Sequence, residues 1–393
     1  MPFEGKPLRE ITEAELRALV QSGMAEHLHL EYKSALYGAD HEGRREHLQD
    51  MCMFANSQGG LLLIGISEQR DAQGQPTGIP DPDADLGIEV PNREAVLQGY
   101  DARVVSCIEE RLRVESHAIP VTGDRYVLAF RIPNSASKPH CVRYNGHVYF
   151  PSRRERNRYP MSVAEIKELA MTAASQLERA TQLLKGAINF ESRAGTDVNL
   201  YLGLIPVFFR EFLIDITNAA VVREICGFDL LGRNLFQNAR YCFEGLERPD
   251  DGRTVLTLMR NGLIRARLSI PMHEVRNEPG VFLFFPTGFD KVIRRFVLRA
   301  QHLFELASLS SPVALAVKLT VPVESFAAYG DVATGDYRQV PVAWRDFEFF
   351  TLVDAFGEPV ERLIRSLCDH IHQTFGEPRS PNFTADGLWT GRE

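Results

Sequence analysis

A helical pattern runs straight into a buried strand between residues 44 and 66, and this order of elements excludes most simple folds. Within 44–56 the apolar residues recur at the spacing of one helix face, namely Leu48, Met51, Cys52 and Ala55. The sequence GGLLLIGI follows directly at 59–66. A short, continuously apolar run of this kind is typical of a strand that is covered on both faces. The segment therefore predicts a strand inside a sheet against which helices pack.

The segment before this helix alternates between apolar and polar residues, which is the pattern of a half-buried strand. In LHLEYKSAL at 28–36 one face is apolar, and the other face carries His29, Glu31 and Lys33. The predicted order is therefore strand, helix, strand.

Further elements complete the first region. Thr12 and Glu15 have the spacing of a capping box, which predicts a short helix that ends at Gly23. The Asp, Pro and Gly residues of 71–91 predict a loop, and a helix is expected over about 92–113. RYVLAFRIP at 125–133 and GHVYF at 146–150 predict two more strands, followed by a helix over 162–185.

The length of 393 residues exceeds what one hydrophobic core normally serves, so two or three domains are expected. We place a first domain at 10–185, a polar linker at 186–199, a second domain at 200–375 and a loosely ordered tail at 376–393. In the second domain, strands are expected in RTVLTLMR, NGLIRARLSI, VFLFF and SPVALAVKLTV, with a hairpin turn at Asn261 and Gly262. Helices are expected at 287–307 and 357–374. The predicted fold class is α+β, with a mixed sheet and packed helices in the first domain and a second, α/β domain.

The composition, 44% hydrophobic and 24% charged, is that of a soluble globular protein, and no apolar run is long enough to span a bilayer. The opening residues, MPFEGKPLRE, lack the apolar core of a secretory signal, and the six cysteines show no CxxC spacing. A cytoplasmic location is therefore expected. The net charge of −8 means that any binding of nucleic acid must depend on a local basic patch.

Glu31 and Lys33 lie two residues apart on a predicted strand, so both side chains project from one face. In many metal-dependent nucleases such a carboxylate holds a divalent cation, while the lysine stabilises charge that develops on the phosphate. The alternative is a solvated strand face with an ion pair of little value.

The context of this pair resembles the Schlafen AlbA-type family. The segments that carry the resemblance occur in the family's order: EHLHLEYK at 26–33, FANSQGGLLLIGISE at 54–68, VLAFRIPNS at 127–135, KPH at 138–140 and VYFPSR at 148–153. The most specific of them is the helix end that runs into the glycine-rich strand. The resemblance covers roughly residues 10 to 170.

The resemblance implies an active site of three carboxylates, which fall on Glu26, Glu31 and Glu68, with Lys33 beside them. It implies that these carboxylates bind Mg²⁺ or Mn²⁺. The chain departs from the family at two places. The third carboxylate is Glu68, whereas the nuclease members usually have Asp. In the family an arginine on the strand that follows VYF is commonly followed by a glycine, which FPSRR lacks. Arg153 is the best counterpart of that arginine.

A basic cluster between 138 and 158 is the expected contact for nucleic acid, because Lys and Arg bind phosphates through counterion release. Its members are Lys138, Arg143, Arg153, Arg154, Arg156 and Arg158, with His140 in the KPH segment. The alternative for RRERNR is a solvated linker into the next helix, and for His140 a strand cap.

A second basic stretch lies along one predicted helix of the second domain, and its members are Lys291, Arg294, Arg295, Arg299 and His302. For this helix a solvated face is favoured over a binding surface.

These observations favour a metal-dependent endoribonuclease, with RNA preferred over DNA. The resemblance implies structured RNA such as tRNA as the substrate. By resemblance, the role is defence of bacteria against phage, with the second domain as sensor, and a homodimer is expected. The first alternative is a non-catalytic DNA- or RNA-binding regulator with an effector-sensing second domain. The second alternative, a nucleotide-dependent enzyme, is weakened because GLLLIG at 60–65 is followed by Ile66, where a phosphate-binding loop needs Lys.

Overall fold

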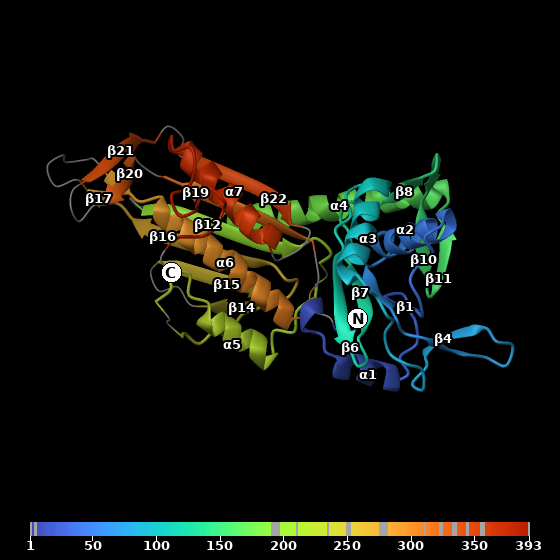
Figure 1. Ribbon diagram of the computed structural model, residues 1–393. Helices are drawn as coiled ribbons and strands as arrows, with labels where there is room; N and C mark the ends of the chain where they lie inside the picture. The colour runs from blue at the N-terminus through green and yellow to red at the C-terminus, as the bar shows by residue number, and fades with distance from the viewer. Residues whose placement is uncertain are drawn as a thin grey trace. The chain divides into compact units, whose positions relative to one another are not determined.

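The computed structural model describes the whole chain except residues 1, 4–5, 190–196, 210, 234–235, 249–252, 275–281, 308, 310–311, 322–324, 332–335, 343–345, 354–357 and 392–393. Contacts divide the chain into two units, Met1–Gln176 with Ser308–Pro312, and Leu177–Ala307 with Val313–Glu393 (Figure 1). The division falls within helix α4 (Val163–Ile188). Residues 190–196 of the expected linker lie outside the described residues.

The first unit is built on a four-stranded sheet in the order β1-β2-β7-β6. These strands are β1 (Leu30–Lys33), β2 (Gly60–Ile64), β7 (Arg125–Ile132) and β6 (Glu115–Val121). β1 and β2 are parallel, whereas β2 pairs antiparallel with β7 and β7 with β6. The expected mixed sheet is confirmed, and β2 is buried along its whole length.

Helices cover both faces of this sheet, as the apolar run of β2 required. One face carries Leu62 and Ile64 and packs against α2 (His41–Asn56) and α3 (Arg93–Cys107). The other face packs against α1 (Glu13–Gln21) and the 3₁₀ helix η1 (Leu8–Glu10), through the remaining core cluster. The capping box of Thr12 and Glu15 is present at the start of α1.

Four short hairpin strands were not predicted. The expected loop 71–91 contains part of the hairpin of β3 (Glu68–Arg70) and β4 (Pro76–Pro80), and the polar segment RRERNR lies in the hairpin of β10 (Pro151–Arg154) and β11 (Asn157–Pro160). β3 and β11 are half-buried or exposed, and the residues that β10 buries include Ser152 and Arg153, so neither hairpin shows the apolar alternation that identifies a half-buried strand.

The helix expected over 92–113 ends at Cys107 instead. The next two residues form β5 (Ile108–Glu109), which pairs with β8 (Cys141–Tyr144), itself paired with β9 (His147–Tyr149). Glu110 then has a left-handed backbone, with φ of 57°, which a helix cannot contain.

The second unit contains a seven-stranded antiparallel sheet in the order β13-β14-β15-β16-β12-β19-β22. The strand bounds are Arg240–Tyr241, Gly245–Arg248, Thr254–Met259, Ile264–Pro271, Asp197–Pro206, Val313–Thr320 and Asp346–Val353. The predicted turn between β15 and β16 is confirmed, because Gly262 has φ of 89° and donates to Met259 across the turn.

Three helices and a smaller sheet complete this unit (Figure 1). The helices are α5 (Ala219–Gly227), α6 (Thr287–Leu306) and α7 (Glu358–Thr374). The smaller sheet has the order β17-β18-β20-β21, with bounds His273–Glu274, Phe282–Phe284, Ser325–Asp331 and Asp336–Pro341. The end of α4 packs on the larger sheet so closely that a Cβ at Gly203 would lie 2.7 Å from Leu184.

The prediction of a loosely ordered tail is wrong, because the described residues up to 391 fold back onto α6. The Ser380 hydroxyl donates to the buried carboxylate of Asp290 at 2.5 Å, and the Asn382 amide donates to the same carboxylate at 2.9 Å. His372 contacts Asp290 from α7 at 3.0 Å. No helix in the described parts of the chain combines the length and the apolar character needed to cross a membrane.

Candidate nucleic-acid and acidic site

The parallel pairing of β1 and β2 fixes the direction in which Glu31 and Lys33 point. Glu31 is opposite Leu62, and Lys33 is opposite Ile64. Because Leu62 and Ile64 belong to the core that contacts α2, the side chains of Glu31 and Lys33 project toward the same helix. The alternation predicted for this strand is confirmed.

Lys33 lies among three carboxylates. Its Nζ is 3.0 Å from Glu46, 3.5 Å from Glu31 and 3.6 Å from Asp50. Burial alone would lower the pKa of Lys33, but the charges of Asp50 and Glu31 outweigh it and raise the pKa above its usual value. Lys33 therefore stays positively charged at neutral pH.

Asp50 is a buried member of this cluster that the sequence did not reveal. Its carboxylate accepts hydrogen bonds from Tyr37 at 2.8 Å and from Arg158 at 2.7 Å. Burial raises the pKa of Asp50, while Lys33 and Arg158 oppose the rise. The sequence offers one signal for this role: Asp50 is a carboxylate that lies between the apolar residues Leu48 and Met51 of the predicted helix.

Glu31 is held by an arginine from the β10–β11 hairpin. The fully buried guanidinium of Arg153 donates to the carboxylate of Glu31, and also to the Leu30 carbonyl at 3.1 Å. It lies over the ring of Phe54, with 4.9 Å between the guanidinium carbon and the ring centroid. Arg153 therefore fixes both the position and the charge balance of Glu31.

Glu26 and Glu68 meet at the backbone of Gly78 on β4. The Glu26 amide donates to the Gly78 carbonyl at 2.7 Å, and the Gly78 amide donates to Glu68 at 2.8 Å. The Tyr32 amide donates to the Glu26 carboxylate at 2.8 Å. A Cβ at Gly78 would lie 3.5 Å from Glu26 Oε2 and 3.1 Å from Arg156, and its φ of 76° also favours glycine.

The three glutamates share one electrostatic environment. Burial raises the pKa of Glu26 to about 7, and the charges of Glu31 and Glu68 add to the rise. The Tyr32 amide and Arg153 act in the opposite direction without cancelling it. Glu26 therefore ionises near neutral pH because it is partly buried and because two further carboxylates lie close to it.

Oxygen ligands with excess negative charge are the donor set that Mg²⁺ and Mn²⁺ prefer, so the chemistry of Glu26, Glu31 and Glu68 fits such an ion. Each of the three has one oxygen fixed by a protein donor, from Tyr32, Arg153 or Gly78. Within the described ranges, however, no group of three or more His, Cys, Asp or Glu is spaced to hold a metal ion. The donor set fits in chemistry and charge, but the side chains are not preassembled around one point.

The predicted basic cluster separates into inward and outward members. Lys138 donates to the Ser57 carbonyl, and burial lowers its pKa to about 8. His140 is fully buried and contacts the Glu110 carbonyl at 2.8 Å, and burial lowers its pKa. Together with Arg153, these two residues face the interior.

The outward members are Arg143, Arg154, Arg156 and Arg158. Arg143 is paired with Glu109 at 2.5 Å, and Arg158 is only 36% exposed because it reaches Asp50. Arg154 lies over the Tyr159 ring at 5.5 Å, and Arg156 donates to the Thr77 carbonyl at 2.7 Å. Arg156 therefore brings an exposed positive charge beside Gly78 and the acidic residues.

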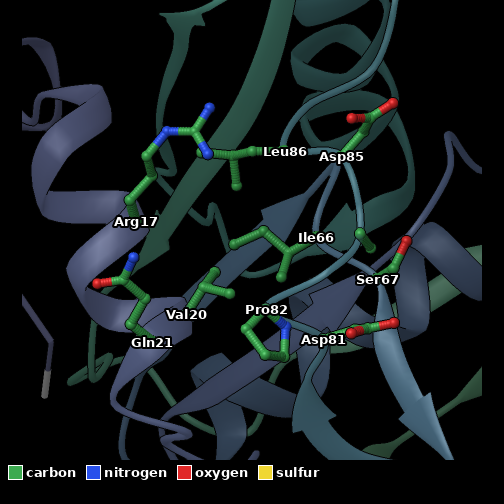
Figure 2. A pocket seen from close by; sticks show the side chains of 10 residues that line it. Arg17, Val20, Gln21, Ile66, Ser67, Asp81, Pro82, Asp85 and Leu86 are labelled. Carbon is green, nitrogen blue, oxygen red and sulfur yellow. The ribbon is translucent and has the colours of Figure 1, made fainter.

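A separate shallow pocket lies between α1 and the end of β2. Figure 2 shows Arg17 and Gln21 from α1 on one side, with Ile66 and Leu86 nearby. None of the three glutamates lines this pocket. The acidic residues are therefore not part of this pocket.

Comparison with known proteins supports the family resemblance of the first unit. Residues 26–162 match the family model described as Schlafen, AlbA_2, and this span begins at Glu26. No curated protein matches the chain.

Among solved structures, the chain is similar to the N-terminal domain of a Nitrosomonas europaea protein named as related to the ATP-dependent DNA helicase RecG, solved by NMR in solution. The identity is 18%, the match covers 39% of this chain and 93% of that one, and the TM-score of 0.28 is too low to bear on fold or function. The family match carries the assignment: residues 26–162 form a Schlafen AlbA_2 domain, a type of domain with a nucleic-acid-related function.

Proposed function

We propose that the first unit is a divalent-cation-dependent endoribonuclease of the Schlafen type that cleaves structured RNA such as tRNA in the cytoplasm. The observation that carries this proposal is the meeting of Glu26 and Glu68 at Gly78, where the charges of Glu31 and Glu68 add to burial in raising the pKa of Glu26. A divalent cation bound at Glu26 would remove this repulsion, so the arrangement favours binding of such a cation.

The proposal assigns Glu26, Glu31 and Glu68 to an Mg²⁺ or Mn²⁺ ion. When bound, such an ion supplies an acidified water and neutralises charge on the phosphate. The chain itself orients the ligands, since Tyr32, Arg153 and Gly78 each fix one carboxylate oxygen. Lys33 keeps its charge beside Glu31 and stabilises negative charge that develops on the phosphate.

RNA would reach this site along the β10–β11 hairpin. Arg156 is exposed, donates to Thr77 and lies next to Gly78, so a phosphate bound by Arg156 would lie beside Glu26 and Glu68. Arg154 adds a second exposed charge on the same hairpin. Charges of this kind bind the backbone of RNA without reading its sequence.

The resemblance to Schlafen nucleases extends the proposal to defence of a bacterial host against phage. In that role the second unit would sense the infection and control the first.

A non-catalytic regulator that binds DNA or RNA is the second candidate. Two observations favour it: Glu31 is already neutralised by Arg153, and the described residues hold no group at metal-ligand spacing. In such a protein the carboxylates would serve only to hold the hairpin and β4 in place.

Incubation of the purified protein with total tRNA and with duplex DNA, each with Mn²⁺ and with EDTA, separates the two candidates. The nuclease proposal predicts cleavage of tRNA in Mn²⁺ and none in EDTA. Glu68→Gln is the test variant, because glutamine can still accept the hydrogen bond from Gly78 while it loses the charge. Glu94→Gln, at an exposed residue in the first turn of α3, is the matched control.

The proposal predicts that Glu68→Gln lowers the cleavage rate at least about a hundredfold, while Glu94→Gln leaves it unchanged. Binding of tRNA without cleavage by the wild-type protein, at every Mn²⁺ concentration, would establish the regulator instead.

A further inference from the structure

The second unit has a basic hollow that the nuclease proposal does not use. One stripe of α6 and a tryptophan of the folded-back tail line an open hollow of about 180 Å³, and the lining consists of Lys291, Arg294, Arg295, Leu298, Arg299 and Trp389. The five α6 residues fall on a single helix face because they are spaced by three or four positions. The hollow lies entirely within the second unit.

Two glycines make room for the arginines of this hollow. The Arg295 guanidinium donates to the Leu230 carbonyl at 2.8 Å, and a Cβ at Gly232 would lie 2.4 Å from that guanidinium. Gly232 also has φ of 69°, which disfavours other residues. A Cβ at Gly227 would similarly approach Arg299 to 3.2 Å. The backbone therefore holds these side chains in position, unlike those of a freely solvated helix face.

The hollow keeps excess positive charge. Arg294 pairs with Glu361 at 3.2 Å, and Arg299 pairs with Glu224 at 2.8 Å. No carboxylate in the described parts of the chain pairs with Lys291 or Arg295. Lys291 and Arg295 together offer two positive charges, which matches a phosphate group at neutral pH.

The indole of Trp389 is a fixed aromatic surface at the same place. The side-chain amide of Asn382 donates to Asp290 of α6, and the backbone carbonyl of Asn382 accepts from the Thr390 amide at 2.9 Å. The tail is therefore fixed on both sides of Trp389. Phe383 packs edge-on against the indole, with 5.1 Å between the ring centroids. The Arg294 guanidinium lies over the indole at 5.3 Å, and the buried indole N–H has no acceptor among the described residues.

We propose that this hollow binds a nucleotide, with phosphate on Lys291 and Arg295 and the base against Trp389. The hollow is bounded by one face of one helix and one aromatic side chain, whereas a strand of RNA needs an extended groove with several aromatic platforms. An aromatic base stacks on the face of an indole, which an inorganic anion or an acidic peptide does less well. The nucleotide would be the effector of the second unit, and its binding requires no nuclease activity.

Trp389 itself reports the test. The sequence has two tryptophans, so Trp344→Phe, at a position outside the described residues, leaves Trp389 as the only indole. This full-length protein is titrated with ATP, AMP, inorganic pyrophosphate and a short single-stranded RNA, and binding is followed by tryptophan fluorescence and by calorimetry. We expect a nucleotide to quench Trp389 and to bind at least about tenfold more tightly than pyrophosphate, because stacking adds to the phosphate contacts.

Lys291→Ala is the decisive variant. No carboxylate in the described parts of the chain pairs with Lys291, so this substitution breaks no described ion pair and should leave the fold intact. It should weaken nucleotide binding at least about tenfold, as loss of one charged phosphate contact does. Arg379→Ala removes the same charge from an exposed position of the second unit outside the hollow and should leave binding unchanged. Trp389→Phe keeps an aromatic ring and should retain part of the affinity by calorimetry.

Three outcomes would overturn the proposal. Pyrophosphate that binds as tightly as the nucleotides would remove the role of the base. An RNA strand that binds more tightly than every nucleotide would make the hollow part of an RNA surface. Nucleotide affinity that is equal in Lys291→Ala and Arg379→Ala would place the ligand elsewhere.

Discussion

Burial and the charges of Glu31 and Glu68 raise the pKa of Glu26 to about 7. A carboxylate must lose its proton to bind a metal ion. The chemistry proposed for the first unit therefore depends on pH at this one residue.

Cleavage of tRNA in Mn²⁺ should rise as the pH increases through about 7, because Glu26 must be ionised to hold the cation. Below that pH the rate should fall about tenfold per pH unit at subsaturating Mn²⁺, since one proton competes with the ion. The measurement is kcat/KM as a function of pH at fixed Mn²⁺. A rate that does not change across neutral pH would show that Glu26 is not a ligand.

Glu26→Gln should stabilise the folded chain above neutral pH in the absence of metal. The folded pKa of Glu26, about 7, exceeds the ordinary value of 4.5, so its contribution to stability is full below pH 4.5 and is lost as the pH rises through about 7. Glutamine avoids this loss and still accepts from Tyr32. We expect a gain of about 1 kcal/mol above neutral pH, allowing for solvent screening at this half-buried site.

Urea unfolding in EDTA, on both sides of neutral pH, measures this difference. If the variant were less stable than the wild-type protein at both pH values, Glu26 would serve as a structural ion-pair partner and not as a repelled carboxylate.

At the scale of elements, the β10–β11 hairpin combines a structural and a binding role. Arg153 and Arg158 are directly opposite each other and reach inward to Glu31 and Asp50. Arg154 and Arg156 remain exposed. Removing all four arginines would therefore mix a loss of stability with a loss of binding.

Alanine at Arg154 and Arg156 together should weaken tRNA binding without unfolding the hairpin. Each phosphate contact contributes roughly 0.7–0.9 to the slope of log affinity against log salt, so the slope should fall by about 1.5. Arg143→Ala is the control, because Arg143 is exposed but already paired with Glu109. Affinities measured across a salt series decide the point, and an unchanged slope would assign RNA binding to another surface.

Periodicity predicted the elements of the first unit that bury one face, and it missed those that do not. The order of β1, α2 and β2 followed from alternating and helical apolar residues, and Glu31 and Lys33 point as that alternation requires. The hairpins of β3–β4 and β10–β11 contain few apolar residues, and the side chains that β10 buries include Ser152 and Arg153, so no alternating apolar pattern marks them.

Long-range contacts of polar residues were also invisible in the sequence. Asp50 meets Lys33 and Arg158 only because α2, β1 and the β10–β11 hairpin come together in the fold. The tail was misread for the same reason, since its order depends on the distant carboxylate of Asp290.

At the scale of the whole molecule, the family model matches a single span, residues 26–162, whereas the resemblance to Schlafen nucleases implies two such lobes that face each other across a groove. We predict a twofold homodimer, which would restore a two-sided groove and is the commonest closed assembly. The apolar strands β18 and β19 belong to the core and do not offer this contact, because β19 is paired with β12 and β22, and Leu283 and Phe284 of β18 are buried. Exposed apolar side chains of the second unit, such as Phe236 and Phe243, are better suited to the contact.

Light scattering on the pure protein, alone and with tRNA, tests this assembly. The prediction is the mass of two chains of 44.3 kDa. The mass of a single chain in both samples would leave one acidic site working without a second lobe.

Binding of Mn²⁺ to the full-length protein, measured by calorimetry without RNA, tests the shared acidic site most directly. The account predicts that the wild-type protein and Glu94→Gln bind about one Mn²⁺ per chain, and that Glu26→Gln and Glu68→Gln each bind it at least about tenfold more weakly. Equal Mn²⁺ affinity in all four proteins, or none in the wild-type protein, would contradict the assignment of these glutamates to one cation.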